Sequence, residues 1–185
     1  MPTPDLRHAL KKALEPDGGA HGAHQAAGAR KSAGARRGHV VVLGVGSELR
    51  SDDAAGVRVA AALGRHRMAG VTAMDGGSAP ENCTAELRRI SPSHLVIVDC
   101  AQMGEAPGTV RLIEAADIGG VSFGTHALPL TVLADYVARE IGCRVTVIGI
   151  QPSTIEFGER LSPAVAAAVE EVSLVLRECL GAIGD

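Results

Sequence analysis

The sequence contains very few aromatic residues: no Trp, one Tyr and two Phe among 185 residues. Nucleic-acid readers that stack bases on aromatic rings, and sugar sites lined by such rings, are therefore not expected. The charge is close to balanced, with 18 Lys and Arg against 21 Asp and Glu and a net charge of −3, which argues against binding to a phosphate backbone. No apolar run approaches the roughly 20 residues that cross a bilayer, so we expect no membrane segment.

Cysteine is sparse as well. The chain has four, at Cys83, Cys100, Cys143 and Cys179, and none forms a C-x-x-C pair. Because isolated cysteines in a chain of this length indicate reduced thiols, we expect a cytoplasmic protein with neither a disulfide framework nor a zinc site. The chain also lacks a G-x-x-x-x-G-K-S/T phosphate loop and a G-x-S-x-G nucleophile elbow, which argues against P-loop and serine-triad chemistry.

Charge and composition change abruptly near residue 39. The first 39 residues hold seven basic and three acidic side chains, whereas the remainder holds eleven and eighteen. The long Gly- and Ala-rich stretch before residue 39 has no large apolar side chain, so it cannot bury enough surface to offset the entropy of ordering it. We therefore expect residues 1–38 to be a flexible basic extension, with a short helix at most around Leu6–Leu14. Residues 39–185 are expected to form one domain.

The domain alternates short apolar runs with helical stripes. Apolar β-branched runs predict strands, and apolar side chains at helical spacing predict helices. The expected strands are 39–46, 70–74, 93–100, 109–114 and 144–150. The expected helices begin at Ser51, near residue 83, near residue 126 and at Ser162-Pro163, with Ser51 and Ser162 as caps. This order predicts a single three-layer α/β/α domain around a mainly parallel sheet of about five strands.

Polar side chains gather where the expected strands end. In open parallel sheets, ligands bind outside the carboxyl ends of the strands, and Asp53, Asp99 and His126 reach that edge from three separate connections. Two carboxylates and an imidazole suit a divalent first-row metal with open positions. The two carboxylates could instead share a proton and activate a water molecule directly. Taken singly, each residue could also serve the fold: Asp53 in a first helical turn, Asp99 as an acceptor for loop amides, and His126 at a helix start.

Two other interpretations of this edge fit less well. Gly44, Gly46 and Asp75 supply part of a dinucleotide-binding pattern, but its third glycine position is Leu49. The same loop carries acids that would repel a pyrophosphate. Cys100 follows Asp99 and has no neighbouring base in the sequence, so packing is favoured over a nucleophilic role.

Several motifs resemble those of the hydrogenase maturation endopeptidases. The segment GVGSELRSDDAAGVRV, which begins at Gly44, is similar to the family signature G-x-G-N-x-L-x-x-D-D/E-x-x-G-x-x-V. Four further segments resemble the branch that serves formate-linked, hydrogenase-3-type enzymes: DGGSAPEN (75–82), HLVIVDCAQMGEAPGTVRLI (94–113), THALPL (125–130) and IGIQP (148–152). The resemblance extends from about Val40 to Leu180.

This resemblance implies an endopeptidase that removes the C-terminal extension from the large-subunit precursor of a nickel–iron hydrogenase after nickel insertion. It implies that nickel, carried by the precursor, is the recognition signal and contacts Asp53, Asp99 and His126. Asp75 matches a supporting residue of the family. The chain departs from the signature at Ser47, where Asn is usual, and at Ala54, where Gly is common.

The resemblance leaves the chemistry of water activation open. Asp53 or Asp99 could act as a general base, which would make the enzyme an aspartic-type peptidase, or the metal could act as a Lewis acid. We expect no organic cofactor, and the precursor as the partner of a monomer that binds neither nucleic acid nor membrane. The alternatives are a non-catalytic maturation chaperone that binds nickel or the precursor, and a nucleotide-binding oxidoreductase.

Overall fold

The computed structural model describes residues 4–14, 38–113, 122–123 and 130–181. The strands are β1 (Val40–Val45), β2 (Val71–Gly77), β3 (His94–Gln102), β4 (Val110–Ile113), β5 (Ser122–Phe123) and β6 (Arg144–Ile150). The α-helices are α1 (Pro4–Leu14), α2 (Ala55–Gly64), α3 (Thr84–Ile90), α4 (Leu130–Glu140) and α5 (Pro163–Gly181). Two short 3-10 helices, η1 (Ser51–Ala54) and η2 (Pro80–Cys83), precede α2 and α3.

The strands form one sheet in the order β2-β1-β3-β6-β4, and β5 pairs with the end of β3. Neighbouring strands from β2 to β6 run parallel, whereas β4 is antiparallel to β6 and β5 is antiparallel to β3. This confirms the mainly parallel sheet of about five strands that the apolar runs predict. The two-residue strand β5 is not among the expected strands, because so short a segment carries no periodic pattern.

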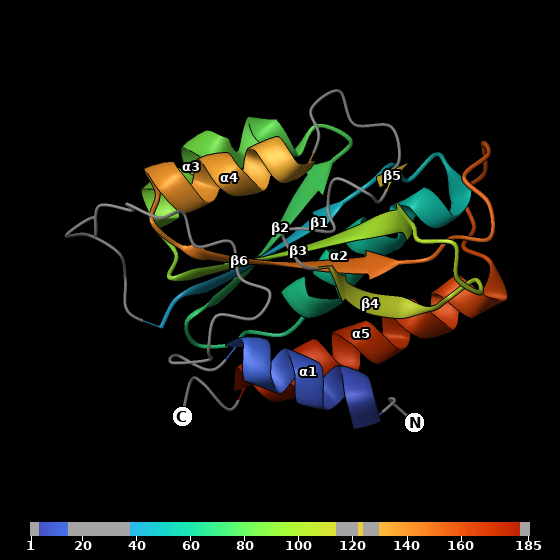
Figure 1. The fold of residues 1–185 in the computed structure, drawn as a ribbon, viewed down its shortest axis with the longest axis horizontal. Helices are drawn as coiled ribbons and strands as arrows, with labels where there is room; N and C mark the ends of the chain where they lie inside the picture. The colour runs from blue at the N-terminus through green and yellow to red at the C-terminus, as the bar shows by residue number, and fades with distance from the viewer. Residues whose placement is uncertain (1–3, 15–37, 114–121, 124–129, 182–185) are drawn as a thin grey trace.

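Helices cover both faces of the sheet. Val40, Val42 and Val96 belong to a core that also contains buried residues of α1, α2 and α5. Val41 and Leu43 belong to a second core, on the other face, with residues of α3 and α4. Figure 1 shows these two layers on opposite sides of the strands. Since both faces are buried, the strands are continuous apolar runs rather than alternating ones.

The expected helical stripes are the buried faces of their helices. All the stripe residues of the last two helices are buried: Leu130, Leu133, Ala134, Val137, Ile141, Val165, Val169, Val172, Leu176 and Leu180. Helix α5 begins at Pro163, as the Ser162-Pro163 pair predicts. The expectation that Ser51 caps a helix is wrong, because Ser51 lies inside η1 with a positive φ of +47°. None of the described helices combines the length and the apolar composition that crossing a membrane requires.

Helix α1 packs against α5 and β4 rather than extending away from the domain (Figure 1). Leu6, Leu10 and Leu14 repeat at helical spacing and are buried in the same core as α5. The Arg7 guanidinium lies 2.7 Å from the Glu178 carboxylate on α5. The short helix expected near Leu6–Leu14 is thus present, and it packs on the domain. Residues 15–37 lie outside the described residues, so for them the flexible-extension interpretation stays a prediction.

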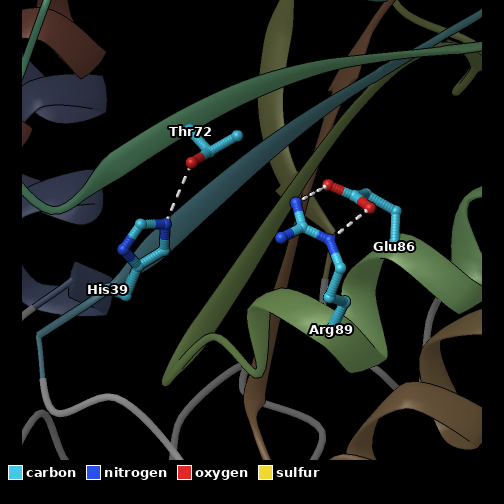
Figure 2. A network of polar contacts seen from close by, with 4 residues as sticks. All are labelled: His39, Thr72, Glu86 and Arg89. Carbon is cyan, nitrogen blue, oxygen red and sulfur yellow. Dashed lines mark hydrogen bonds and ion pairs between the residues drawn. The ribbon is translucent and has the colours of Figure 1, made fainter.

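Histidine–threonine pairs join neighbouring strands at the amino edge of the sheet. The Nε2 atom of His39 lies 2.9 Å from Oγ1 of Thr72 on β2 (Figure 2). The Nε2 atom of His94, which begins β3, lies 2.8 Å from Oγ1 of Thr146 on β6. His94 is buried at the start of its strand. Figure 2 also shows an ion pair between Arg89 and Glu86, which both lie on the exposed side of α3.

The packing of α1 can be tested by shortening Leu10. Leu10→Ala should lower the free energy of unfolding by about 2–5 kcal/mol, because Leu10 is fully buried in the core. Denaturant-induced unfolding measures this difference. Lys12→Ala, on the exposed side of the same helix, is the control and should change the value by less than about 0.5 kcal/mol. Equal stability of the parent chain and Leu10→Ala would contradict the packing.

His94 should make the stability depend on pH. Burial first, and then the positive charge of Arg144, lower the pKa of His94 from 6.5 to about 3. Below pH 6.5 the unfolded chain binds a proton that the folded chain does not bind, so stability falls as the pH falls through this window. Between pH 7 and pH 5 the loss from this group should be about 2 kcal/mol.

The measurement is the free energy of unfolding at pH 7, 6 and 5, in the parent chain and in His94→Gln. The variant lacks the titrating imidazole and should lose about 2 kcal/mol less over this range. Parallel pH profiles for the two proteins would show that His94 does not cause the dependence.

Candidate active site

The parallel strands end at one edge of the sheet, and the first connection at that edge carries two adjacent acids. After β1, residues 46–50 lead into η1, where Asp53 is fully buried. Its Oδ2 accepts a hydrogen bond from the Ser47 amide at 3.0 Å. Its Oδ1 is also buried and makes no hydrogen bond with any described residue. Because a buried polar atom without a partner is costly, this oxygen is a candidate ligand atom of the edge.

The neighbouring Asp52 is also fully buried, but both of its oxygens are engaged. Oδ2 accepts hydrogen bonds from the amides of Ser153 (2.9 Å) and Thr154 (3.1 Å) and from the Ser162 hydroxyl (2.9 Å). Oδ1 accepts one from the Ser162 amide at 2.6 Å. Asp52 therefore joins η1 to the segment between β6 and α5. Sequence reasoning misses this role, because the acid pair alone does not tell which carboxylate the fold uses.

Close backbone packing sets the position of η1 on the sheet. A Cβ atom on Gly46 would clash with the carbonyl oxygen of Asp53, and one on Gly56 would clash with that of Val98. Only glycine fits at these two positions. The glycines of this loop thus bring η1 and α2 against β1 and β3. These glycines therefore have a packing role. That role accounts for them without a dinucleotide-binding loop, and it explains why the third glycine of the dinucleotide-binding pattern is absent.

Asp99 lies inside β3 rather than at its end, because β3 continues to Gln102. It is fully buried, it pairs with Gly149 of β6 in the sheet register, and its Oδ1 accepts a hydrogen bond from the Cys100 amide at 2.7 Å. The carbonyl oxygen of Val98, the residue before Asp99, lies against Gly56 of α2, and Gly56 follows Asp53 by about one helical turn. Asp53 and Asp99 are therefore brought to the same part of the carboxyl edge.

The same acids affect the pKa of the Cys100 thiol. Burial raises the pKa of the Cys100 thiol far above its ordinary value, and the charges of Asp99, Asp53 and Asp52 raise this pKa further. A thiol that is held protonated in this way is a poor nucleophile. The expectation that Cys100 packs rather than reacts is consistent with this environment. The electrostatic effects also indicate that all three carboxylates lie near Cys100.

His126, the third expected ligand, falls in residues 124–129, which lie outside the described part of the chain. Within the described part, no three His, Cys, Asp or Glu side chains form a group that could bind a metal ion. The structure therefore describes Asp53 and Asp99, and their role as ligands stays a prediction. The contribution of His126 stays a prediction.

Asp75 and Gln151 accept hydrogen bonds from backbone amides in the connections at the carboxyl edge. Asp75 is exposed, and its Oδ1 accepts a hydrogen bond from the Gly77 amide at 2.8 Å, while the Gly77 carbonyl accepts one from Gly46 at 2.9 Å. The buried Gln151 side chain accepts a hydrogen bond from the Met103 amide at 2.7 Å and so fixes the connection that follows β3. The sequence signals Gln151 only by its place after a strand, because its partners lie far away in the chain.

Asp52 and Asp53 should respond differently to the same substitution. Asp52→Ala removes the acceptor of four hydrogen bonds and should lower the free energy of unfolding by about 3 kcal/mol or more. Asp53→Ala removes one accepted bond together with an unpartnered oxygen and should cost less than about 1.5 kcal/mol. Denaturant unfolding measures both values. A larger loss for Asp53→Ala would contradict the distinction between the two acids.

Known proteins match most of the domain. A family model described as hydrogenase maturation protease matches residues 57–178, a range that includes Asp99 and His126 and begins shortly after Asp53. The hydrogenase 3 maturation protease of Escherichia coli (strain K12) is 37% identical over 133 residues. That alignment covers 71% of this chain and 85% of the relative.

Solved structures of known proteins also share the fold of this domain. A nickel–iron hydrogenase maturation protease from Thermococcus kodakarensis KOD1 has a TM-score of 0.70 at 28% identity, over 77% of this chain and 92% of that one. The solution structure of an endopeptidase from Escherichia coli has a TM-score of 0.66 at 35% identity, over 74% and 87%. The matched sequence and the shared fold show that this chain belongs to the hydrogenase maturation protease family and is a peptidase.

Proposed function

We propose that this peptidase removes the C-terminal extension from the large-subunit precursor of a nickel–iron hydrogenase once nickel has been inserted. The nickel belongs to the precursor and docks on Asp53, Asp99 and His126. Docking positions the peptide bond to be cut next to the two carboxylates. Membership of the family supports a hydrogenase precursor as the substrate, and the Escherichia coli relative is named for hydrogenase 3.

One observation carries the proposal: the buried Oδ1 of Asp53 has no hydrogen-bond partner among the described residues, and Asp99 is buried in the same part of the edge. A cation that binds this oxygen would offset the cost of burying it. Carboxylate oxygens and an imidazole nitrogen are ligands that divalent first-row metals accept. Three ligands leave coordination positions open, which suits an ion that the precursor already holds through its own ligands.

Hydrolysis requires a nucleophilic water and a proton for the leaving amine. In the aspartic-type route, one carboxylate takes a proton from water while the hydroxyl adds to the carbonyl carbon. The same carboxyl group then gives the proton to the amine nitrogen as the C–N bond breaks. In the metal-assisted route, the nickel ion polarises the water or the carbonyl oxygen. In both routes, positioning by the docked ion can supply about 7 kcal/mol or more of the acceleration.

The remaining expectations belong to the same proposal. The enzyme acts in the cytoplasm as a monomer, uses no organic cofactor, and has the precursor as its macromolecular partner. The departures at Ser47 and Ala54 lie beside the site: the Ser47 amide donates to Asp53, and Ala54 follows it in η1. Since the Ser47 contact uses the backbone, a serine side chain preserves it.

Substitution of the three proposed ligands tests the function. Asp53→Asn, Asp99→Asn and His126→Ala should each slow the cleavage of a nickel-loaded precursor by about 100-fold or more, because each removes a ligand or the general base. The mass of the precursor before and after incubation measures the cleavage. Glu170→Gln, an exposed acid on α5, is the matched control and should cleave at the parent rate.

Two outcomes would contradict the proposal in different ways. Cleavage at the parent rate by all three ligand variants would show that the site is assigned to the wrong residues. Stable binding of the nickel-loaded precursor by the parent chain without any loss of mass would identify a maturation chaperone rather than a peptidase of this substrate.

A further inference from the structure

Three large apolar side chains are highly exposed among the residues that the structure describes: Leu49 (61%), Val132 (47%) and Phe157 (86%). Single exposed apolar side chains are ordinary and need no explanation. Leu49 and Phe157 differ from Val132, because they lie on two segments that meet at the carboxyl edge of the sheet. Phe157 is also one of only two Phe residues in a chain with one Tyr and no Trp.

Backbone hydrogen bonds bring Leu49 and Phe157 together. The Gly158 amide donates to the Leu49 carbonyl at 3.0 Å, and the Ser51 amide donates to the Gly158 carbonyl at 2.6 Å. These two bonds form a parallel bridge between Arg50 and Gly158. Leu49 and Phe157 immediately precede the two bridged residues. Since residues in register on parallel segments are neighbours, the bridge places the backbones of Leu49 and Phe157 side by side.

Hydrogen bonds fix the backbone segments that carry Leu49 and Phe157. Asp52 accepts hydrogen bonds from Ser153, Thr154 and Ser162, so it fixes the segment that carries Phe157 at both ends. A Cβ atom on Gly158 would lie 2.5 Å from the Ser51 hydroxyl oxygen, which shows how closely the two segments approach. Two apolar side chains are therefore presented to solvent from a backbone that is already ordered, so little entropy is lost when a partner covers them.

The same segment leads directly to the proposed catalytic carboxylate. The Ser47 amide donates to Oδ2 of Asp53, and the Asp53 amide donates to the Arg50 carbonyl at 3.0 Å. Leu49 lies between Ser47 and Arg50 in the sequence. The loop that carries Leu49 is therefore the loop that positions Asp53.

We propose that Leu49 and Phe157 form an apolar docking pair for the precursor, and that they bind an apolar side chain of the polypeptide that leads to the cleaved bond. The inference rests on the proposed function, because it takes the substrate to be a protein whose nickel reaches Asp53. Two side chains that project into solvent cannot enclose a small molecule, but they can be buried against a protein surface. Apolar anchors of this kind carry much of the affinity of an interface.

The test compares the parent chain with Leu49→Ser, Phe157→Ser and the double variant. The substrate is a nickel-loaded hydrogenase large-subunit precursor with its extension, and the readouts are its Kd, and the KM and kcat of its cleavage. The double variant should raise Kd and KM by about tenfold or more and leave kcat within about twofold, because the pair contributes to docking and not to bond cleavage. Val132→Ser is the matched control and should change none of these values.

Leu49→Met and Phe157→Leu should retain most of the affinity, because both keep an apolar side chain. All variants should unfold at the parent temperature, since both side chains are exposed. An unchanged Kd in the double variant, or an equal loss in Val132→Ser, would overturn the docking pair and leave the proposed function standing. If the parent chain binds the precursor but never shortens it, the proposed function fails, and the Kd values still decide the inference.

Discussion

The hydrogen bonds that Asp52 accepts hold the carboxyl edge of this protein together. One buried carboxylate joins the connection after β1 to the segment between β6 and α5, which are far apart in the sequence. The position of Asp53, one residue away, depends on this junction, and so does the bridge that carries Leu49 and Phe157. Because charge-assisted bonds from several donors are strong, a single side chain can order a loop region.

Polar side chains are buried at both edges of the sheet. At the amino edge, His39 and His94 each bind a threonine of a neighbouring strand, and these contacts join adjacent strands. At the carboxyl edge, Asp53 keeps a buried oxygen without a partner among the described residues. Nδ1 of His94 is likewise buried without a hydrogen-bond partner among the described residues, but the Asp53 oxygen lies at the edge where parallel sheets bind ligands.

Much of the fold can be predicted from the sequence. The features that cannot be predicted depend on contacts between distant parts of the chain. The strands other than β5 follow from continuous apolar runs, and the stripes of α4 and α5 follow from helical periodicity. The packing of α1 is not predictable in this way, because Leu6, Leu10 and Leu14 are buried only if α5 offers a complementary face. The positive φ of Ser51 and the role of Asp52 likewise depend on partners about a hundred residues away.

The most direct measurement is the affinity of the parent chain and of Asp53→Asn for the precursor, each determined with nickel-loaded and nickel-free precursor. If Oδ1 of Asp53 binds the nickel ion, nickel should raise the affinity of the parent chain for the precursor by about tenfold or more. It should raise the affinity of Asp53→Asn for the precursor very little. An equal gain from nickel in both proteins would contradict the account, since the ion would then be held by other groups.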